Sequence, residues 1–341
     1  MNKPDLANWF LLCGLLAGCV ALPGCGRTAT PDVRLHTDSQ GVATGMLFYG
    51  RDVRDADLRT LNDHPEIEEL ALQECNQVTD AGLAHVASAP KLKKLNISRV
   101  AISDEALKAL AGHDQLVELE LAHTQIAGQG LKHLAALPLQ RLTINSRAVT
   151  AEGLQALAEL DALRQLELQC QEISLADLPA LGQLKQLESL DAYYTPAGEN
   201  GIEVLRGLAH LKKLVLASEH VNDDSIAAIN TLTALEELHL IGSNISDNGL
   251  RSLSLPNLKM LNIDADIAIT DAALGNLQGL PSLETLYAAD TAIVGLDFAG
   301  LAPLKNLKEV RLALSQYKGG SEAQSELRTL LPKCKLVLVG Q

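Results

Sequence analysis

Aromatic residues are scarce in this chain of 341 residues, where they make up 3% of the sequence and include a single tryptophan. Apolar residues nevertheless make up 47% of the chain. Aliphatic side chains, leucine above all, must therefore form the core, because few large rings are present to fill it. A core of many similar aliphatic side chains is typical of a structure that repeats one small unit.

Basic residues are also few relative to acidic ones. The chain has 28 lysines and arginines against 42 aspartates and glutamates, which gives a formal net charge of −14. Nucleic-acid binding needs a basic surface that neutralises phosphates, so this balance argues against nucleic acid as a partner. It favours a solvated acidic surface or a basic protein partner.

Sequence motifs for catalysis and for metal binding are missing. The nine histidines form no H-E-x-x-H pair, and no phosphate-binding glycine loop or G-x-S-x-G turn occurs. The three cysteines beyond residue 25 are Cys75, Cys170 and Cys334. They lie far apart in the sequence, so we expect small buried side chains rather than a disulfide framework. We therefore expect no metal, no cofactor and no enzyme activity.

What the chain does contain is a repeated pair of leucines. Leu70 and Leu72 recur as Leu95 and Ile97, and successive pairs are spaced by 23 to 25 residues. The later pairs are Leu119/Leu121, Leu142/Ile144, Leu166/Leu168, Leu214/Leu216, Leu238/Leu240, Leu261/Ile263 and Val310/Leu312, with weaker copies at Leu190/Ala192 and Leu286/Ala288. Apolar residues that alternate with polar ones indicate short strands with one buried face.

A helical segment is expected after each strand. In the first full repeat, Val78-Thr79-Asp80 supplies an apolar residue and then capping side chains, and Leu83 and Val86 follow at helical spacing. This period and the L-x-x-L-x-L pattern resemble the leucine-rich repeat, and "LALQECNQVTDAGL", with Cys75, resembles its cysteine-containing subclass. The resemblance implies an α/β fold, a curved solenoid with a parallel β-sheet on its concave face and helices on its convex face.

We expect the repeat domain to cover residues 45–341 and to hold about 11–12 repeats. Its first strand contains Met46 and Phe48, and a helix over residues 321–331 with a strand over 335–339 forms the C-terminal cap. The pattern is irregular over residues 190–202 and again over 264–268, where we expect rebuilt loops.

The N-terminus resembles the signal peptide of a bacterial lipoprotein. An apolar run from Trp9 to Leu22 follows Lys3 and ends in Leu22-Pro23-Gly24-Cys25. We expect a signal peptide over residues 1–24, a lipidated Cys25 with Cys19 as the alternative, and a tether over 25–44. An uncleaved anchor helix of this length would be too short to span a bilayer. The protein is then exported and lipid-anchored to the cell envelope, on the periplasmic face or the cell surface.

Stacked strands place the residues between the leucines in rows on the concave face. One row carries Glu69, Lys94, Glu118 and Arg141, and later Lys213 and Glu237, so we expect a ladder of ion pairs. A second row brings Glu167 beside Asp191. Paired carboxylates also serve in glycosidases, so a hydrolase is an alternative, although an open sheet lacks a pocket that excludes water.

A less polar patch lies in the C-terminal half of the same face. Tyrosine is enriched among binding anchors, and exposed apolar surface rimmed by charge marks interaction sites. The expected partner-binding residues are Tyr193, Tyr194, Val215, His239, Ile241, Met260 and Tyr287. We therefore expect a monomeric, non-catalytic scaffold that binds a protein. A structural, self-associating envelope protein is the other alternative.

Overall fold

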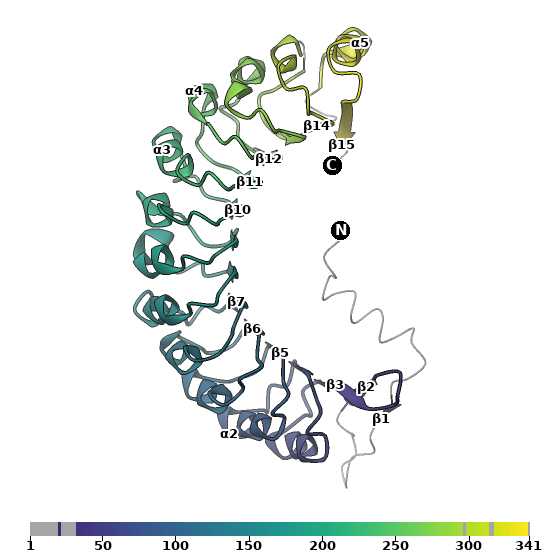
Figure 1. Cartoon of the computed structure of the whole chain (residues 1–341), viewed down its shortest axis with the longest axis vertical. Helices are drawn as coiled ribbons and strands as arrows, with labels where there is room; N and C mark the ends of the chain where they lie inside the picture. The colour runs from purple at the N-terminus through teal and green to yellow at the C-terminus, as the bar shows by residue number, and fades with distance from the viewer. Residues whose placement is uncertain (1–19, 22–31, 296–297, 314–316, 340–341) are drawn as a thin grey trace. The chain divides into compact units, whose positions relative to one another are not determined.

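The computed structural model of the protein describes residues 20–21, 32–295, 298–313 and 317–339. The chain divides into two compact units, Met1–Ala148 and Val149–Gln341. The sequence pattern, which predicts one repeat domain over residues 45–341, gave no sign of this division. In each unit, strands and short helical segments alternate along the chain (Figure 1).

Unit 1 starts with two antiparallel strand pairs, β1 with β2 and β2 with β3, after which β3 to β7 pair in parallel and in chain order. Its elements are β1 (Val20–Ala21), β2 (Asp32–Thr37), β3 (Ala43–Tyr49), η1 (Asp55–Asp63), β4 (Glu69–Gln73), α2 (Asp80–Leu83), η2 (Ala84–Ser88), β5 (Lys94–Ser98), η3 (Asp104–Leu110), β6 (Glu118–Ala122), η4 (Gln129–Leu134) and β7 (Arg141–Asn145), where η marks a 3₁₀-helix.

Unit 2 pairs β8 to β15 in parallel and in chain order. Its elements are η5 (Gly153–Glu159), β8 (Gln165–Leu168), η6 (Leu175–Asp177), η7 (Pro179–Gln183), β9 (Ser189–Ala192), η8 (Gly201–Leu205), β10 (Lys213–Leu216), η9 (Asp223–Ser225), α3 (Ile226–Ile229), β11 (Glu237–Leu240), α4 (Asp247–Ser252), β12 (Met260–Asn262), η10 (Asp271–Gly279), β13 (Thr285–Tyr287), η11 (Ala299–Leu301), β14 (Glu309–Ala313), α5 (Gly320–Leu330) and β15 (Lys335–Val339).

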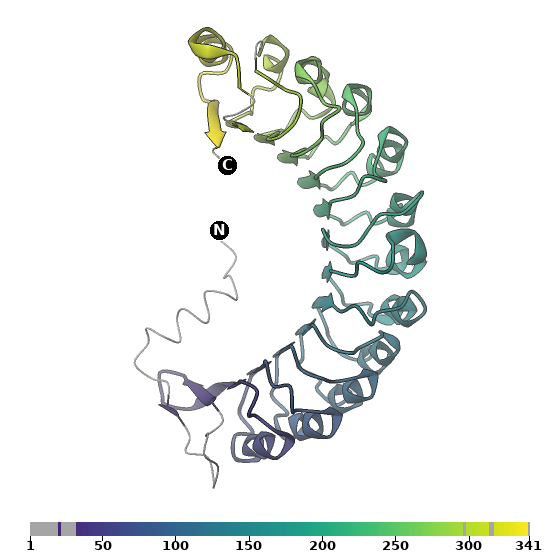
Figure 2. The same cartoon turned by 180° about the vertical axis from the view of Figure 1, so that it is seen from behind.

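The core of each unit lies between its strands and its helical segments, which Figure 2 shows on opposite sides of each repeat. The paired strand leucines fill this core; Leu72 and Leu238, for example, are fully buried. Most helical segments are 3₁₀ turns, because a repeat this short leaves room for only a few helical residues. The predicted C-terminal helix and strand are confirmed as α5 and β15.

The three cysteines beyond residue 25 have the predicted environment. Cys75, Cys170 and Cys334 are buried free thiols. The Cys75 thiol donates to the Phe48 carbonyl oxygen at 3.4 Å. Burial raises the pKa of the Cys75 and Cys334 thiols to about 11 in each case, so neither forms a reactive thiolate at neutral pH.

The predicted tether over residues 25–44 is wrong for its described part. β2 lies within it and pairs with β3, with Val33 opposite Phe48 and Leu35 opposite Met46. Val33 and Leu35 are buried, so alternate apolar residues tie this segment to the first parallel strand. Cys19 and Cys25 lie outside the described residues. Within the described part of the chain, no helix has the length and apolar character needed to cross a bilayer.

Candidate binding surface on the sheet face

The sheet face of each unit carries the side chains that alternate with the core leucines. In unit 2 its central row is Glu167, Asp191, Val215, His239, Asn262, Tyr287 and Arg311, which are Cα partners on successive strands. In unit 1 the same row is Ala71, Asn96, Glu120 and Thr143. The register expected from the leucine pattern is therefore confirmed within both units.

Two of the predicted anchors, Tyr193 and Tyr194, are exposed together where the chain leaves β9. They are 38% and 51% exposed, and their rings meet edge to face with centroids 4.7 Å apart. The Tyr193 amide donates to Asp191 Oδ1 at 3.1 Å, which fixes the turn that presents the pair. Because the two rings already contact each other, they lose little conformational freedom when they bind a partner.

Tyr287 is placed differently from this tyrosine pair. It lies on β13, four strands from β9 and so roughly 19 Å away. The guanidinium of Arg311 on β14 stacks on its ring, 4.0 Å from the centroid. Tyr287 is therefore half-covered by a cation, and a partner at this point meets arginine as well as tyrosine.

His239 belongs to a polar network that crosses several strands. Its Nε2 lies 2.8 Å from Glu237 Oε1, and its Nδ1 lies 3.3 Å from the amide nitrogen of Asn262. Lys213 also donates to Glu237. The hydrogen bond from His239, opposed by partial burial and helped by Lys213, lowers the pKa of Glu237 to about 2. The carboxylate is therefore ionised throughout the physiological range.

The remaining predicted patch residues contribute unequally. Ile241, just after β11, is half-buried, and Met260 lies in the row of Glu237 rather than in the central row. Val215 is only 6% exposed, because neighbouring side chains of the sheet cover this small residue. Its predicted role as an exposed contact is therefore wrong. The predicted patch consists of an exposed tyrosine pair and, on the strands after β9, a partly buried surface of polar and apolar residues.

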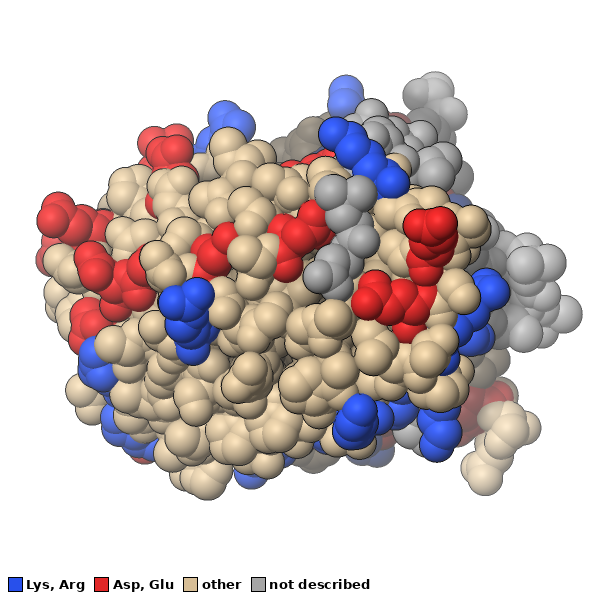
Figure 3. Space-filling view, turned by 90° about the horizontal axis from the view of Figure 1, so that it is seen from above, with Lys and Arg blue, Asp and Glu red and all other residues tan. Residues whose placement is uncertain are grey.

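The charged row behaves as predicted. Lys94 pairs with Glu69 at 3.0 Å, Arg141 pairs with Glu118 at 3.2 Å, and Lys213 pairs with Glu237. The side chains of the first two pairs are partly exposed to solvent, so each of these pairs contributes roughly 0–1 kcal/mol to stability. The Lys213–Glu237 pair is more buried. Seen from above, in Figure 3, the surface carries acidic and basic side chains among uncharged residues.

Glu167 and Asp191, the carboxylates of the hydrolase alternative, are neighbours on β8 and β9. Each already has a local partner, since the Gln169 amide donates to Glu167 and the Tyr193 amide donates to Asp191. Both lie half-buried on the sheet face. The two carboxylates are therefore each held by a group that follows closely in the chain.

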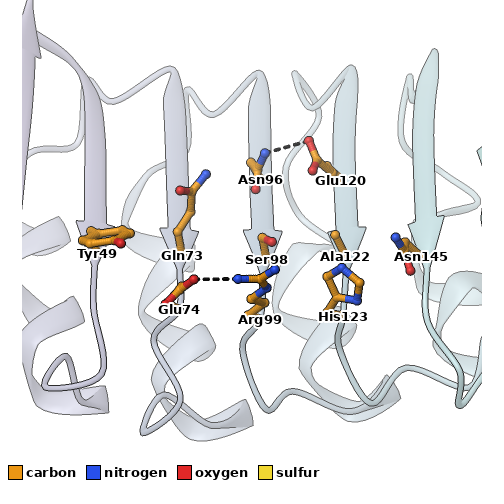
Figure 4. Close-up of a pocket in the computed structure, with 10 residues that line it drawn as sticks. All are labelled: Tyr49, Gln73, Glu74, Asn96, Ser98, Arg99, Glu120, Ala122, His123 and Asn145. Atoms are coloured by element: carbon orange, nitrogen blue, oxygen red, sulfur yellow. Dashed lines mark hydrogen bonds and ion pairs between the residues drawn. The ribbon is translucent and has the colours of Figure 1, made fainter. Parts of the chain in front are cut away.

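The sequence did not reveal a hollow of about 400 Å³ on the sheet face of unit 1 (Figure 4). It lies at the carboxyl ends of β3 to β7 and includes Tyr49, Glu74, Arg99 and His123. The repeat pattern could have pointed to this hollow, because Glu74, Arg99 and His123 occupy the same position of successive repeats. Among the described residues, no cluster of histidine, cysteine and carboxylate side chains is arranged to hold a metal.

Stacked strand–turn–helix units with leucine-filled cores define the leucine-rich-repeat fold, and folds of this class commonly serve as protein-binding scaffolds. A family profile described as "Leucine Rich repeat" matches residues 88–111. This range holds the last residue of η2, β5 and the whole of η3.

Solved structures similar to this chain come from several organisms. An internalin from Listeria monocytogenes is 22% identical, with a TM-score of 0.47, over 78% of this chain and 86% of that one. A leucine-rich-repeat protein from Leptospira interrogans is 16% identical, with a TM-score of 0.46, over 82% and 80%. The complex of Rad7 and Elc1 from yeast gives 20% identity and a TM-score of 0.49 over 85% and 74%.

Proposed function

We propose that the protein is a non-catalytic scaffold that holds a partner protein against the sheet face of unit 2, with Tyr193 and Tyr194 as the anchor. The observation that carries the proposal is the exposure of these two rings side by side, in a chain where only 3% of the residues are aromatic. Exposed aromatic rings beside charged groups are typical of the centre of a protein interface.

The surroundings of the tyrosine pair support this reading. Ile241 adds half-buried apolar surface two strands away, and the network of Lys213, Glu237 and His239 supplies a polar rim. A partner that places apolar groups on the tyrosines and hydrogen-bonding groups on this rim would match both parts of the surface.

The first prediction tests the anchor by site-specific photocrosslinking. A photoreactive phenylalanine analogue at Tyr194, in the full chain, should capture one partner that mass spectrometry identifies. Purified partner is then titrated against the chain. The Tyr193→Ala/Tyr194→Ala variant should bind more than about tenfold more weakly, because a buried aromatic anchor commonly contributes ~2 kcal/mol or more.

The matched control is Tyr49→Ala, which removes a similarly exposed tyrosine from unit 1. It should leave partner affinity unchanged, and all variants should melt like the parent chain. Undiminished affinity in the double variant would remove the tyrosine pair as the anchor. A crosslink to a second copy of the chain would favour the self-associating alternative.

We further propose that the protein is exported and held at the envelope membrane by a lipid on Cys25. The second prediction is that Cys25→Ser abolishes acylation, as intact-mass spectrometry and membrane fractionation would show. The support is the apolar run that ends in Leu22-Pro23-Gly24-Cys25. If acylation survives in Cys25→Ser and is lost in Cys19→Ser, the lipid is on Cys19. If it survives in both variants, the assignment of the lipid to Cys25 is wrong, and if the parent chain carries no acyl group, the anchor proposal is wrong.

A further inference from the structure

The wall of the hollow in unit 1 is formed mostly by polar and charged residues. Figure 4 shows most of its side chains at the same end of adjacent strands, with Asn96 and Glu120 farther back along β5 and β6. Most of the lining residues end a strand, as Tyr49 and Ala122 do, or directly follow one, as Glu74, Arg99 and His123 do. Tyr49 and Ala122 are the only lining residues with mainly apolar side chains. A ligand here would be recognised chiefly through hydrogen bonds, with one ring available for stacking.

Three of these residues hold a backbone conformation that favours glycine. Glu74, Arg99 and His123 have φ of 55°, 55° and 53°. This left-handed conformation is costly for residues with a Cβ atom. At the matching position, Gly50 precedes them in unit 1 and Gly242 follows in unit 2, both with positive φ. In unit 2, Ala265 and Asp290 also have positive φ at this position, so the conformation belongs to the repeat. What distinguishes unit 1 is that three long polar side chains occupy the position in successive repeats and line one hollow.

The donors and acceptors of the wall are held in place by their neighbours. Arg99 Nη1 lies 2.7 Å from Glu74 Oε1, and the Asn96 amide donates to Glu120 Oε2 at 2.6 Å. The Asn96 Oδ1 atom is buried and has no hydrogen-bond partner among the described residues. A buried acceptor without a partner costs free energy, so the chain itself leaves the hydrogen bonding of this part of the wall incomplete.

We propose that this hollow binds a neutral oligosaccharide, with Tyr49 stacked on a sugar ring and the polar side chains bonded to its hydroxyl groups. This goes beyond the protein-binding function proposed for unit 2. A sugar hydroxyl both donates and accepts, which suits a wall where Arg99 lies beside Glu74 and where the amide of Asn96 lies beside the carboxylate of Glu120. The apolar face of a sugar ring suits the exposed side of Tyr49.

Other ligand classes fit the hollow less well. An extended peptide takes its specificity from apolar pockets for its side chains, and this wall offers only Tyr49 and Ala122. A polyanion would meet the carboxylates of Glu74 and Glu120 against the single cation of Arg99. The five strands span roughly 19 Å, which suits a short chain of sugars rather than a single ring.

The test is saturation-transfer NMR on the full chain, in a detergent that has no sugar headgroup. The probes are cellotetraose, chitotetraose, maltotetraose and mannotetraose, with tetragalacturonate as an anionic probe. We expect transfer to at least one neutral tetrasaccharide. Tyr49→Ala should weaken its binding by about tenfold or more, whereas Tyr49→Phe should stay within about threefold. Tyr194→Ala is the matched control and should bind like the parent chain.

A second variant separates binding from folding. Arg99→Gly and His123→Gly relieve the left-handed backbone while they remove side chains from the wall. The double variant should melt at or near the temperature of the parent chain and bind at least about tenfold more weakly. The proposal is overturned by unchanged binding in this variant, by no transfer to any neutral probe, or by tighter binding of tetragalacturonate. None of these results bears on the crosslink at Tyr194.

Discussion

Asp266 shows how a single residue responds to the irregular loop after β12. It is fully buried, its Oδ1 accepts from the Ser243 amide, and its Oδ2 has no partner among the described residues. Burial, opposed by the hydrogen bonding of Ser243, raises the pKa of Asp266 to about 8. Next to it, Ile267 is 81% exposed. The inserted residues thus bury a carboxyl group and expose an isoleucine.

The third prediction concerns this carboxyl group and pH. The pKa is higher in the folded chain than the ordinary value of about 4, so the unfolded chain binds fewer protons between about pH 4 and pH 8. Stability should therefore fall as the pH rises through this window. Asp266→Asn keeps the oxygen that accepts from Ser243 and cannot ionise, so it should be more stable than the parent at pH 8, by a few kcal/mol at most.

Urea unfolding at a series of pH values would measure this effect. The control is Asp114→Asn, which removes the same charge from an exposed position. The two variants should differ most at pH 8 and converge near pH 4. An Asp266→Asn profile that runs parallel to the parent over the whole range would show that Asp266 does not titrate in this window.

At the scale of elements, hydrogen bonds join the start of one helical segment to the start of the next. The carboxylate of Asp55 accepts from the amide and the hydroxyl of Thr79 at 2.7 and 2.8 Å. Asp223 does the same for Ser246, at 2.8 and 2.6 Å. The Ser246 hydroxyl also accepts from the Asn248 amide, so one side chain caps its own helix and binds the preceding repeat.

These hydrogen bonds explain why a glycine follows the capping residues. A Cβ atom on Gly249 would lie 2.2 Å from Asp223 Oδ1, and one on Gly82 would lie 2.2 Å from Asp55 Oδ1. The glycine of T-D-x-G-L is therefore required by packing against the previous repeat rather than by its backbone. The sequence reveals the capping residues, whereas their second partner lies in another repeat.

The fourth prediction compares two glycine substitutions in unit 2. Gly249→Ala should destabilise the protein by roughly 1–3 kcal/mol, because the methyl group displaces a carboxylate held by two hydrogen bonds. Gly275→Ala is the control, since a Cβ atom there has no neighbour within 4 Å. It should be neutral or stabilise by up to about 1 kcal/mol. Equal melting temperatures for the two variants would contradict the role given to Asp223.

At the scale of the whole molecule, stability comes from contacts between successive repeats. Within each unit, an inner strand such as β11 pairs with the strands before and after it, and the leucine pairs are buried. In such an array, a defect in one repeat acts first on the adjoining interfaces. Leu238, fully buried in β11, is a suitable place to introduce one.

The fifth prediction is that Leu238→Asp unfolds the repeats around β11. An unpaired carboxylate in the core costs several kcal/mol, which is a large part of the ~5–15 kcal/mol stability of a typical domain. Hydrogen exchange should show lost protection in β10 to β12 first, with β4 to β6 of unit 1 retained longer. Thr233→Asp adds the same charge at an exposed site and should leave protection unchanged. Full protection in Leu238→Asp would mean that Leu238 does not face the core.

The sequence alone determined the repeat, the register and the ion-pair ladder. A period of two within each strand and of 23 to 25 residues between strands leaves one way to bury every leucine pair, and this aligns Glu69 with Lys94 and Glu167 with Asp191. Such regularities are local or periodic, so they can be read along the chain.

Only the tertiary structure decided which side chains remain exposed and which strands find partners. β2 carries no leucine pair of the repeat, and it joins the sheet because β3 offers a free edge. Val215 is covered by its neighbours, whereas Tyr193 and Tyr194 turn outward after β9. The hollow beside Tyr49 depends on five strands at once. Burial and cavities arise from residues far apart in the chain, and the pattern of a single repeat does not contain them.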